Sequence, residues 1–403
     1  MNLPTIWIYR EIEKIWPELE REYPIIVVTG TRQVGKTSLL ENLYGSANIT
    51  SLDLPRNAEA AEGSPEAFLE GLKLPAVLDE IQYAPGLFRP LKWYADTVLK
   101  PSGQKILLTG SERFSLMEKV SESLAGRAGI IELNTLSLKE LEEHTRLEAS
   151  GHQLVEWLLK GGYPGLHATG GNRERFYSNL LSTYIERDIK RLINIQETRD
   201  FDRFLRICSL RTGQMLSMNN IASDLGISQT TVKRWLGVLQ ASAVIDLVEP
   251  WHENANKRLV KTPKLYFNDT GLCTFLAGLN TKDEVLRSPL FGAFFETLCY
   301  NQLRKSLQNS AIKENIYYFR TRDGVEVDFL IPRGTECLVF ECKYSENPNA
   351  DLRHIKVLEE ATNLTIRNIC VLNSGRRPYR LGKERKVFAV SVVDAGRIEL
   401  ERL

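Results

Sequence analysis

The chain has 403 residues, of which 43% are hydrophobic and 26% charged, so it is long and apolar enough to form two or three globular domains. Its 52 Lys and Arg residues against 51 Asp and Glu residues give a formal charge of +1, which excludes a chain-wide basic field for nucleic acid. No apolar run approaches the roughly 18 residues of a membrane span, and the N-terminus lacks the basic and apolar segments of a signal peptide. Six cysteines without paired spacing are typical of reduced, buried thiols. We therefore expect a cytoplasmic protein that has no membrane partner.

Short apolar segments at regular intervals predict a parallel sheet in the first third of the chain. They alternate with helical stretches, which is the pattern of an α/β fold with helices on both faces of the sheet. The expected strands are residues 25–28, 49–52, 76–78, 106–108 and 130–133.

The first of these strands leads directly into a P-loop, in which Gly30 is followed after four residues by Gly35, Lys36 and Thr37. In such a loop, backbone N–H groups face the phosphates of a nucleotide, the lysine reaches the β- and γ-phosphates, and the threonine hydroxyl ligates Mg²⁺. The helix expected after the loop adds its dipole to phosphate binding. The predicted ATP-binding residues are Gly30, Thr31, Arg32, Gln33, Val34, Gly35, Lys36, Thr37 and Ser38.

Polar residues at the ends of later strands predict the rest of an ATPase site. Asp79 and Glu80 follow an apolar strand, and we expect Asp79 to hold Mg²⁺ through water and Glu80 to act as the base for the attacking water. Ser111 is a candidate sensor of the γ-phosphate, with a turn-forming serine as the alternative. Arg127 is a candidate arginine finger supplied by a neighbouring copy, with a surface arginine as the alternative. A finger supplied in this way predicts a homo-oligomer.

A helix-turn-helix pattern follows in the middle of the chain, where residues 219–225 and 228–239 are joined by Gly226 and Ile227. Ser228 is a plausible N-cap for the second helix. The residues expected to point outward, toward DNA, are Gln229, Thr230, Lys233 and Arg234, whereas Val232, Leu236 and Leu239 would face inward. A structural spacer or a protein contact is the alternative.

The last part of the chain carries acids in an order suited to metal binding. The strand period of two places Glu341 and Lys343 on one face of residues 338–343, and Asp328 could lie beside Glu341 in an antiparallel pair. Asp328 and Glu341 would hold one or two hard cations, Lys343 would orient the nucleophile, and Glu296 on the preceding helix would bind metal-bound water or a second ion. An exposed cross-strand Glu–Lys pair is the alternative.

These motifs resemble the prokaryotic AAA+ ATPase family that has an AAA_14-type P-loop domain and a C-terminal DUF4143 domain. The order of Glu296, Asp328, Glu341 and Lys343 also resembles the PD-(D/E)xK nuclease superfamily, although Asp328 lacks the usual preceding proline. The expected units are an AAA+ core (1–135), a helical lid (136–200), a winged helix-turn-helix domain (201–260) and a nuclease-like DUF4143 domain (261–403).

The resemblance implies hydrolysis of ATP with Mg²⁺, coupled to DNA binding and with or without metal-dependent DNA cleavage. A nucleotide-gated switch or DNA-binding regulator with a non-catalytic C-terminal domain is the alternative.

Overall fold

The computed structural model describes residues 7–110, 120, 122–184, 198–251, 261–312, 314–349, 353–381 and 387–395. The chain divides into two compact units. The first holds residues 1–135 together with the short stretches 241–243 and 308–311, and the second holds residues 136–240, 244–307 and 312–403. None of the helices in the described parts of the chain is long and apolar enough to cross a membrane.

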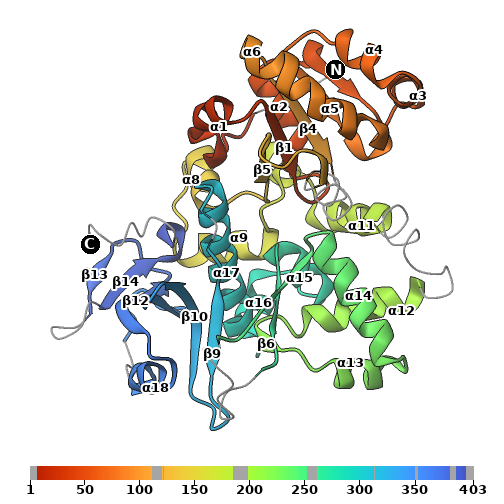
Figure 1. Ribbon diagram of the computed structural model, residues 1–403. Coiled ribbons are helices and arrows are strands. Elements are labelled where there is room, and N and C mark those ends of the chain that lie inside the picture. The colour runs from red at the N-terminus through yellow and green to blue at the C-terminus, as the bar shows by residue number, and fades with distance from the viewer. Residues whose placement is uncertain are drawn as a thin grey trace. The chain divides into compact units, whose positions relative to one another are not determined.

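The first unit contains a five-stranded parallel sheet with the strand order β2-β3-β4-β1-β5. Figure 1 labels three of its strands, β1, β4 and β5. The predicted strands are confirmed, because each falls on one strand of this sheet. The elements are η1 (Glu11–Lys14), α1 (Trp16–Glu22), β1 (Ile25–Thr29), α2 (Lys36–Tyr44), η2 (Ser46–Asn48), β2 (Ile49–Ser51), α3 (Pro55–Gly63), α4 (Pro65–Glu70), β3 (Ala76–Asp79), η3 (Ile81–Tyr83), η4 (Pro85–Leu87), α5 (Phe88–Tyr94), the π-helical turn η5 (Ala95–Leu99), α6 (Lys100–Ser102), β4 (Ile106–Gly110) and β5 (Ala128–Glu132).

The central strand β1 shows why the strands of this sheet could be predicted from the sequence. It is buried along its whole length, and its neighbours β4 and β5 run parallel to it. A strand buried on both faces is a continuous apolar run without alternation. Thr29, at the end of β1, is paired with Gly110 and Glu132, so the carboxyl ends of the three strands share one edge of the sheet. Polar residues that follow these strands therefore come together at that edge.

The second unit begins with helices and a small antiparallel sheet in which β8 lies between β6 and β7. The strand β8, which the sequence pattern grouped with the last part of the chain, thus pairs with strands of the helix-turn-helix region. The elements of this part are α8 (Leu138–Thr145), α9 (Gly151–Lys160), α10 (Pro164–Ala168), α11 (Arg173–Tyr184), α12 (Thr198–Ser209), β6 (Gln214–Met215), α13 (Met218–Leu225), α14 (Gln229–Ala241), β7 (Ile245–Val248), β8 (Lys264–Phe267), α15 (Thr270–Leu276) and α16 (Lys282–Arg287).

Two glycine-containing segments lock the helices of this unit together. Gly161 has φ +77°, and a Cβ atom there would lie 2.3 Å from the Tyr177 hydroxyl, while a Cβ atom on Gly271 would lie 2.2 Å from the same oxygen. Asp269 accepts hydrogen bonds from the Tyr177 hydroxyl at 2.8 Å and from the Gly162 N–H at 2.8 Å. Close packing therefore requires glycine at positions 161 and 271.

The rest of the second unit is a six-stranded mixed sheet with the strand order β13-β14-β12-β11-β10-β9 (Figure 1). On one face, Phe329 packs against Tyr266 and Tyr300, and on the other Val339 belongs to a buried cluster with Ile355. The elements are α17 (Phe291–Asn309), β9 (Tyr317–Arg320), β10 (Glu326–Arg333), β11 (Glu336–Lys343), α18 (Arg353–Thr362), β12 (Thr365–Asn373), β13 (Tyr379–Arg380), β14 (Val387–Ser391) and η8 (Val392–Asp394). The six cysteines are free thiols, and five of them are buried.

Candidate functional site

The loop between β1 and α2 has the backbone geometry that its glycines make possible. Gly30 has φ +143° and Gly35 has φ +94°, both in the region that favours glycine. A Cβ atom on Gly30 would lie 2.2 Å from the carbonyl oxygen of Leu133, so the loop also needs a residue without a side chain at this position. Lys36 is the first residue of α2, which places the amino terminus of that helix directly at the loop.

Lys36 points into the loop. Its Nζ atom donates hydrogen bonds to the carbonyl oxygens of Gly30 at 2.9 Å and Thr31 at 3.0 Å, and the side chain is buried. A lysine held there presents its charge to the space that the loop encloses. The cationic group and the curled backbone fit the phosphates of a nucleotide.

Thr37 and Asp79 meet at the carboxyl edge of the sheet. The Thr37 Oγ1 atom donates a hydrogen bond to Asp79 Oδ1 at 3.0 Å, and Thr109 Oγ1 donates a second one to the same oxygen at 2.5 Å. A hydroxyl and a carboxylate oxygen in contact are the hard ligands that Mg²⁺ prefers. The two residues predicted to hold Mg²⁺ are therefore side by side, and their donor set fits the ion.

Glu80 has a backbone conformation that is unusual for a residue with a side chain. Its φ is +58°, and its N–H donates a hydrogen bond to Thr109 Oγ1 at 3.0 Å. Gln82 Nε2 donates to the Glu80 carboxylate at 2.5 Å. Left-handed backbone at a polar residue is typical of functional sites, where neighbouring contacts hold the strained conformation in place. Thr109 was missed in the sequence, although it directly precedes Gly110 at the end of the same strand that led to Ser111.

Of the two further residues predicted for the ATPase site, the structure describes Arg127 but not Ser111. The Arg127 backbone carbonyl pairs with Ile25 at the amino end of β1, so Arg127 lies at the sheet edge opposite the P-loop. Its guanidinium contacts the Asp96 carboxylate at 2.7 and 2.9 Å, and these hydrogen bonds lower the pKa of Asp96 to about 2. A role on the nucleotide of its own chain does not fit this position, and a role on that of a neighbouring copy stays a prediction. Ser111 lies outside the described residues.

Arg10 supports the P-loop from the segment before α1, and no motif in the sequence pointed to this residue. The side chain is 3% exposed, and it donates hydrogen bonds to the carbonyl oxygens of Val34 at 2.9 Å and Asn134 at 2.6 Å. A buried guanidinium bonded to carbonyls on both sides fixes the loop against the end of β5.

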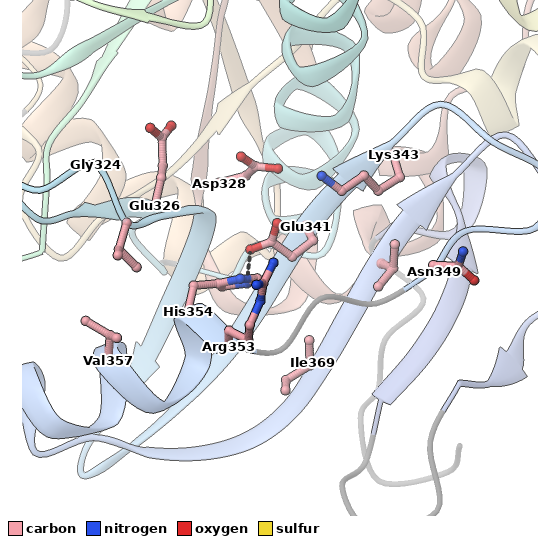
Figure 2. Close-up of a pocket in the computed structure, with 12 residues that line it drawn as sticks. Gly324, Glu326, Asp328, Glu341, Lys343, Asn349, Arg353, His354, Val357 and Ile369 are labelled. Carbon is pink, nitrogen blue, oxygen red and sulfur yellow. Dashed lines mark ion pairs between the residues drawn. The ribbon is translucent and has the colours of Figure 1, made fainter.

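The second unit contains a cavity of about 600 Å³ on the mixed sheet, and three predicted residues line it: Asp328, Glu341 and Lys343. The strands β10 and β11 are antiparallel, with Phe329 opposite Phe340. In this register Asp328 and Glu341 are the next two residues opposite each other, so their side chains lie on the same face of the sheet. Figure 2 shows the two carboxyl groups and the Lys343 amine directed toward one space. The predicted antiparallel placement of Asp328 beside Glu341 agrees with this register.

Asp328 is held in place by its surroundings. Its Oδ2 atom accepts a hydrogen bond from the Cys342 N–H at 2.8 Å. The register between β9 and β10 shifts between Val327 and Leu330, so the pairing of these strands is irregular next to Asp328. Burial, and then the charge of Glu341, raise the pKa of Asp328 to about 6. Two acids this close favour a cation between them.

Glu341 carries a buried oxygen suited to a metal. Its Oε1 atom receives no well-directed hydrogen bond from the described residues, although His354 Nε2 lies 3.0 Å from it (Figure 2). Together with Asp328 it offers carboxylate oxygens, which are ligands for Mg²⁺ or Mn²⁺. The donor set therefore fits a divalent ion. His354, at the start of α18, was not identified in the sequence.

Glu296 lies close to Asp328 but is occupied by other partners. Carboxylate oxygens of Glu296, Glu326 and Asp328 lie within 4.8 Å of one another. Lys264 Nζ donates to Glu296 at 2.8 Å, and the Tyr266 hydroxyl donates to it at 2.5 Å. Burial, and then the charge of Asp328, raise the pKa of Glu296 to about 7. Glu326 could have been found from its spacing of two from Asp328, whereas Lys264 comes from another sheet and has no local signal.

The helix-turn-helix region presents the side chains that the sequence predicts. The Ser228 hydroxyl accepts a hydrogen bond from the Thr231 N–H at 3.0 Å, as an N-cap does. The exposed residues of α14 include Gln229, Thr230, Lys233 and Arg234, and the buried ones are Val232, Trp235, Leu236 and Leu239. The polar face predicted for DNA contact is thus on the surface.

The loop, the lysine and the acid at the end of β3 define the first unit as a P-loop domain. Residues 22–142 match the AAA domain family AAA_14, residues 151–283 match a domain of unknown function, DUF8612, and residues 291–393 match the domain of unknown function DUF4143. The protein therefore has an AAA-type P-loop domain and a C-terminal DUF4143 domain.

Relatives of this chain occur in mycobacteria. It is 29% identical over 330 residues to an uncharacterized protein of Mycobacterium tuberculosis, which corresponds to 81% of this chain and 71% of that protein. An uncharacterized protein of Mycobacterium bovis matches to the same extent, with 29% identity over 81% of this chain and 71% of that protein.

Solved structures resemble the chain more distantly. A Walker-type ATPase of Pyrococcus abyssi has a TM-score of 0.43 at 19% identity, over 66% of this chain and 94% of that one. A single-residue variant of RuvB of Thermotoga maritima has a TM-score of 0.31 at 18% identity, over 59% of this chain and 88% of that one. The Orc1 protein of Aeropyrum pernix, solved in complex with DNA, has a TM-score of 0.27 at 12% identity, over 68% of this chain and 94% of that one.

Proposed function

We propose that this protein is an Mg²⁺-dependent ATPase that binds DNA and cleaves it in a metal-dependent reaction. The observation that carries the cleavage half is the convergence of Asp328, Glu341 and Lys343 on one cavity. The ATPase half is supported by the AAA domain match and by the contact of Thr37 with Asp79 at 3.0 Å.

In the ATPase site, each residue has a distinct task. Lys36 neutralises phosphate charge, and the backbone of the P-loop donates hydrogen bonds to phosphate oxygens. Thr37 and Asp79 would hold the magnesium ion, which offsets charge on the phosphates when it is bound. Glu80 would take a proton from the attacking water. Arg127 would be contributed by another copy of the chain, and we propose a homo-oligomer on that basis.

In the cleavage site, Asp328 and Glu341 would hold the metal ion. A bound divalent ion acts there as a Lewis acid toward a phosphodiester. Lys343 is exposed and lines the same cavity, so its ammonium group is free to orient the nucleophile or to contact a phosphate oxygen. The exposed face of α14 would hold DNA through Lys233 and Arg234 on the backbone and Gln229 on a base edge.

Replacement of Glu80 by Gln tests the ATPase half. The variant keeps the shape of the side chain but removes the base, so we expect ATP binding within about threefold of the wild type and hydrolysis at least 100-fold slower. Release of inorganic phosphate measures the rate. Glu66→Gln, at an exposed position of α4, is the matched control and should leave the rate unchanged. Equal hydrolysis by Glu80→Gln and the wild type contradicts the role of Glu80.

Replacement of Glu341 by Gln tests the cleavage half. We expect supercoiled plasmid to be nicked in Mn²⁺ by the wild type and not by Glu341→Gln, because the amide cannot hold the ion as a carboxylate does. Glu336→Gln, at an exposed position of the same strand, is the control. A wild type that binds DNA but does not cut it in Mg²⁺ or Mn²⁺ would favour a DNA-binding regulator with a non-catalytic C-terminal domain.

A further inference from the structure

We infer that Lys264 is a built-in cation of the acidic site, which consists of the carboxylates of Glu296, Glu326, Asp328 and Glu341. Because of this cation, the site binds one divalent ion, between Asp328 and Glu341, instead of two. This inference rests on the metal-dependent cleavage proposed above. It assigns to Lys264 a positioning role, because the residue acts by holding two carboxylates rather than by touching the substrate.

The position of Lys264 is that of an ion among acids. Its Nζ atom lies 2.8 Å from Glu296 Oε1, forms an ion pair with Glu326 Oε1, and lies 5.4 Å from the centre of the Tyr318 ring. The side chain is 3% exposed. A buried ammonium is stable only when its charge is matched, and here two carboxylates and an aromatic face match it.

The carboxylates that contact Lys264 are those with the spacing of a metal site. Oxygens of Glu296, Glu326 and Asp328 come within 4.8 Å of one another, so they could share an ion. Glu296 also accepts a hydrogen bond from Tyr266, and Glu326 also pairs with Arg320. A divalent ion placed in this group would lie within a few ångströms of two fixed cations, whose repulsion opposes its binding.

The remaining carboxylates, those of Asp328 and Glu341, are the ones available to bind a metal ion. Among the described residues, no Lys or Arg side chain forms an ion pair with either carboxylate. Both line the cavity, where a hydrated ion can reach them (Figure 2). Lys264 and Arg320 together match the charges of Glu296 and Glu326. The carboxylates of Asp328 and Glu341 remain, and one divalent ion beside them matches their two charges.

Lys264 lies on a different sheet from the strands that carry Glu326, Asp328 and Glu341. It belongs to β8, which pairs with β6 and β7, whereas Glu326, Asp328 and Glu341 belong to the mixed sheet. A change at Lys264 can therefore alter the charge of the site without removing a strand from that sheet.

Counting bound Mn²⁺ by isothermal titration calorimetry tests this inference. The full-length protein is used at pH 7.5 without nucleotide or DNA, in a Thr37→Ala background that removes the contribution of the P-loop. We expect one ion in this background, none after Asp328→Asn, and one after Glu326→Gln. Lys264→Met should gain a second ion, Lys264→Met with Glu326→Gln should return to one, and Lys264→Arg should keep one.

The variants separate the possible failures. Two ions with Lys264 intact, or loss of the ion in Glu326→Gln, overturns the inference, and neither result depends on whether Lys264→Met folds. An ion kept in Asp328→Asn also overturns the inference, because the ion would then not lie at Asp328. If the wild type cuts no DNA, the proposed cleavage function fails. Loss of the ion in Asp328→Asn and a gain of one ion in Lys264→Met would support the inference even in that case.

The unfolding temperature gives the same contrast between the variants without a count of bound ions. Addition of Mn²⁺ should raise the unfolding temperature of Lys264→Met more than that of the wild type or Lys264→Arg, because two ions bind the folded state instead of one. Equal shifts for all three proteins contradict the inference.

Discussion

Thr109 Oγ1 donates its hydrogen to Asp79 Oδ1 at 2.5 Å, and Thr109 Oγ1 in turn accepts a hydrogen bond from the N–H of Glu80 at 3.0 Å. One hydroxyl thus joins the two acids that are proposed to hold Mg²⁺ and to activate water. Thr109 is fully buried, so no solvent molecule can take its place without rearrangement.

Replacement of Thr109 by Val should slow ATP hydrolysis by about tenfold or more. The change removes a hydrogen bond to a charged group, worth about 1.5–3 kcal/mol, and each 1.36 kcal/mol in the barrier is a factor of about ten. Binding of a fluorescent ATP analogue should change by less than about threefold, because the phosphate contacts of Lys36 are kept. Thr109→Ser should restore most of the rate. Equal rates for Val and Ser variants would show that the hydroxyl has no role.

Replacement of Lys36 by Ala should weaken ATP binding by about a hundredfold, since it removes the cation that faces the phosphates. Fluorescence of a bound ATP analogue measures the affinity. Lys92→Ala, at an exposed position of α5 in the same unit, is the control and should bind normally. Tight binding by Lys36→Ala would contradict the placement of the nucleotide in this loop.

Replacement of Gly30 by Ala should destabilise the first unit by more than about 3 kcal/mol. The added Cβ atom would lie 2.2 Å from a backbone oxygen and would need φ +143°, so overpacking and backbone strain add together. Gly63→Ala has no neighbour within 4 Å, lies at the end of α3 and is expected to be neutral or stabilising by up to about 1 kcal/mol. Urea unfolding monitored by tryptophan fluorescence compares the two variants. Similar midpoints would refute this account of the loop.

The metal-free second unit should lose stability as the pH rises from about 4 to about 7. Asp328 has a folded pKa of about 6 and Glu296 one of about 7, both above their ordinary values of 3.8 and 4.5. The folded state therefore holds protons that the unfolded state has released in this range, and their contribution to stability is present at low pH and lost as the pH rises through the folded pKa values.

Asp328→Asn should remove part of this pH dependence, by about 1–2 kcal/mol between pH 5 and pH 8. Unfolding is measured in EDTA so that no metal contributes. Glu336→Gln, which changes an exposed acid of β11, should keep the dependence of the wild type. An Asp328→Asn curve parallel to that of the wild type would show that this carboxyl group does not carry a raised pKa.

The double substitution Lys233→Ala and Arg234→Ala should weaken DNA binding by about tenfold or more at low salt, and it should reduce the salt dependence of binding. Each phosphate contact that is lost lowers the slope of log K against log salt by about 0.9. Fluorescence anisotropy of a labelled duplex gives both quantities. Lys282→Ala, at a half-buried lysine of the second unit that pairs with Glu156 at 3.3 Å, is the control. An unchanged slope would favour a structural role for α14.

The P-loop and the parallel sheet were predictable because their requirements are local in the sequence. A strand buried on both faces is a run of apolar residues, and a phosphate cradle needs glycines and a lysine at fixed spacing. Asp328, Glu341 and Lys343 were also predictable, because the period of two and one antiparallel pairing determine their positions.

Lys264 and Arg10 were not predictable in the same way. Lys264 reaches the acids from β8, a strand of the other sheet, and Arg10 reaches Val34 from a segment before the first helix. Such contacts depend on how separate elements pack, which no local pattern encodes. Thr109 was overlooked for a different reason, since a threonine that ends a buried strand looks like an ordinary strand residue until its hydroxyl meets Asp79.

Plasmid cleavage with and without ATP tests the central proposal most directly. Supercoiled DNA is incubated in Mn²⁺ with the wild type, Lys36→Ala and Asp328→Asn, and nicked and linear products are measured on a gel. We predict cleavage by the wild type, none by Asp328→Asn under any condition, and an ATP effect in the wild type that Lys36→Ala abolishes. Cleavage by Asp328→Asn at the wild-type rate, or none by the wild type in either metal, would contradict the proposed nuclease.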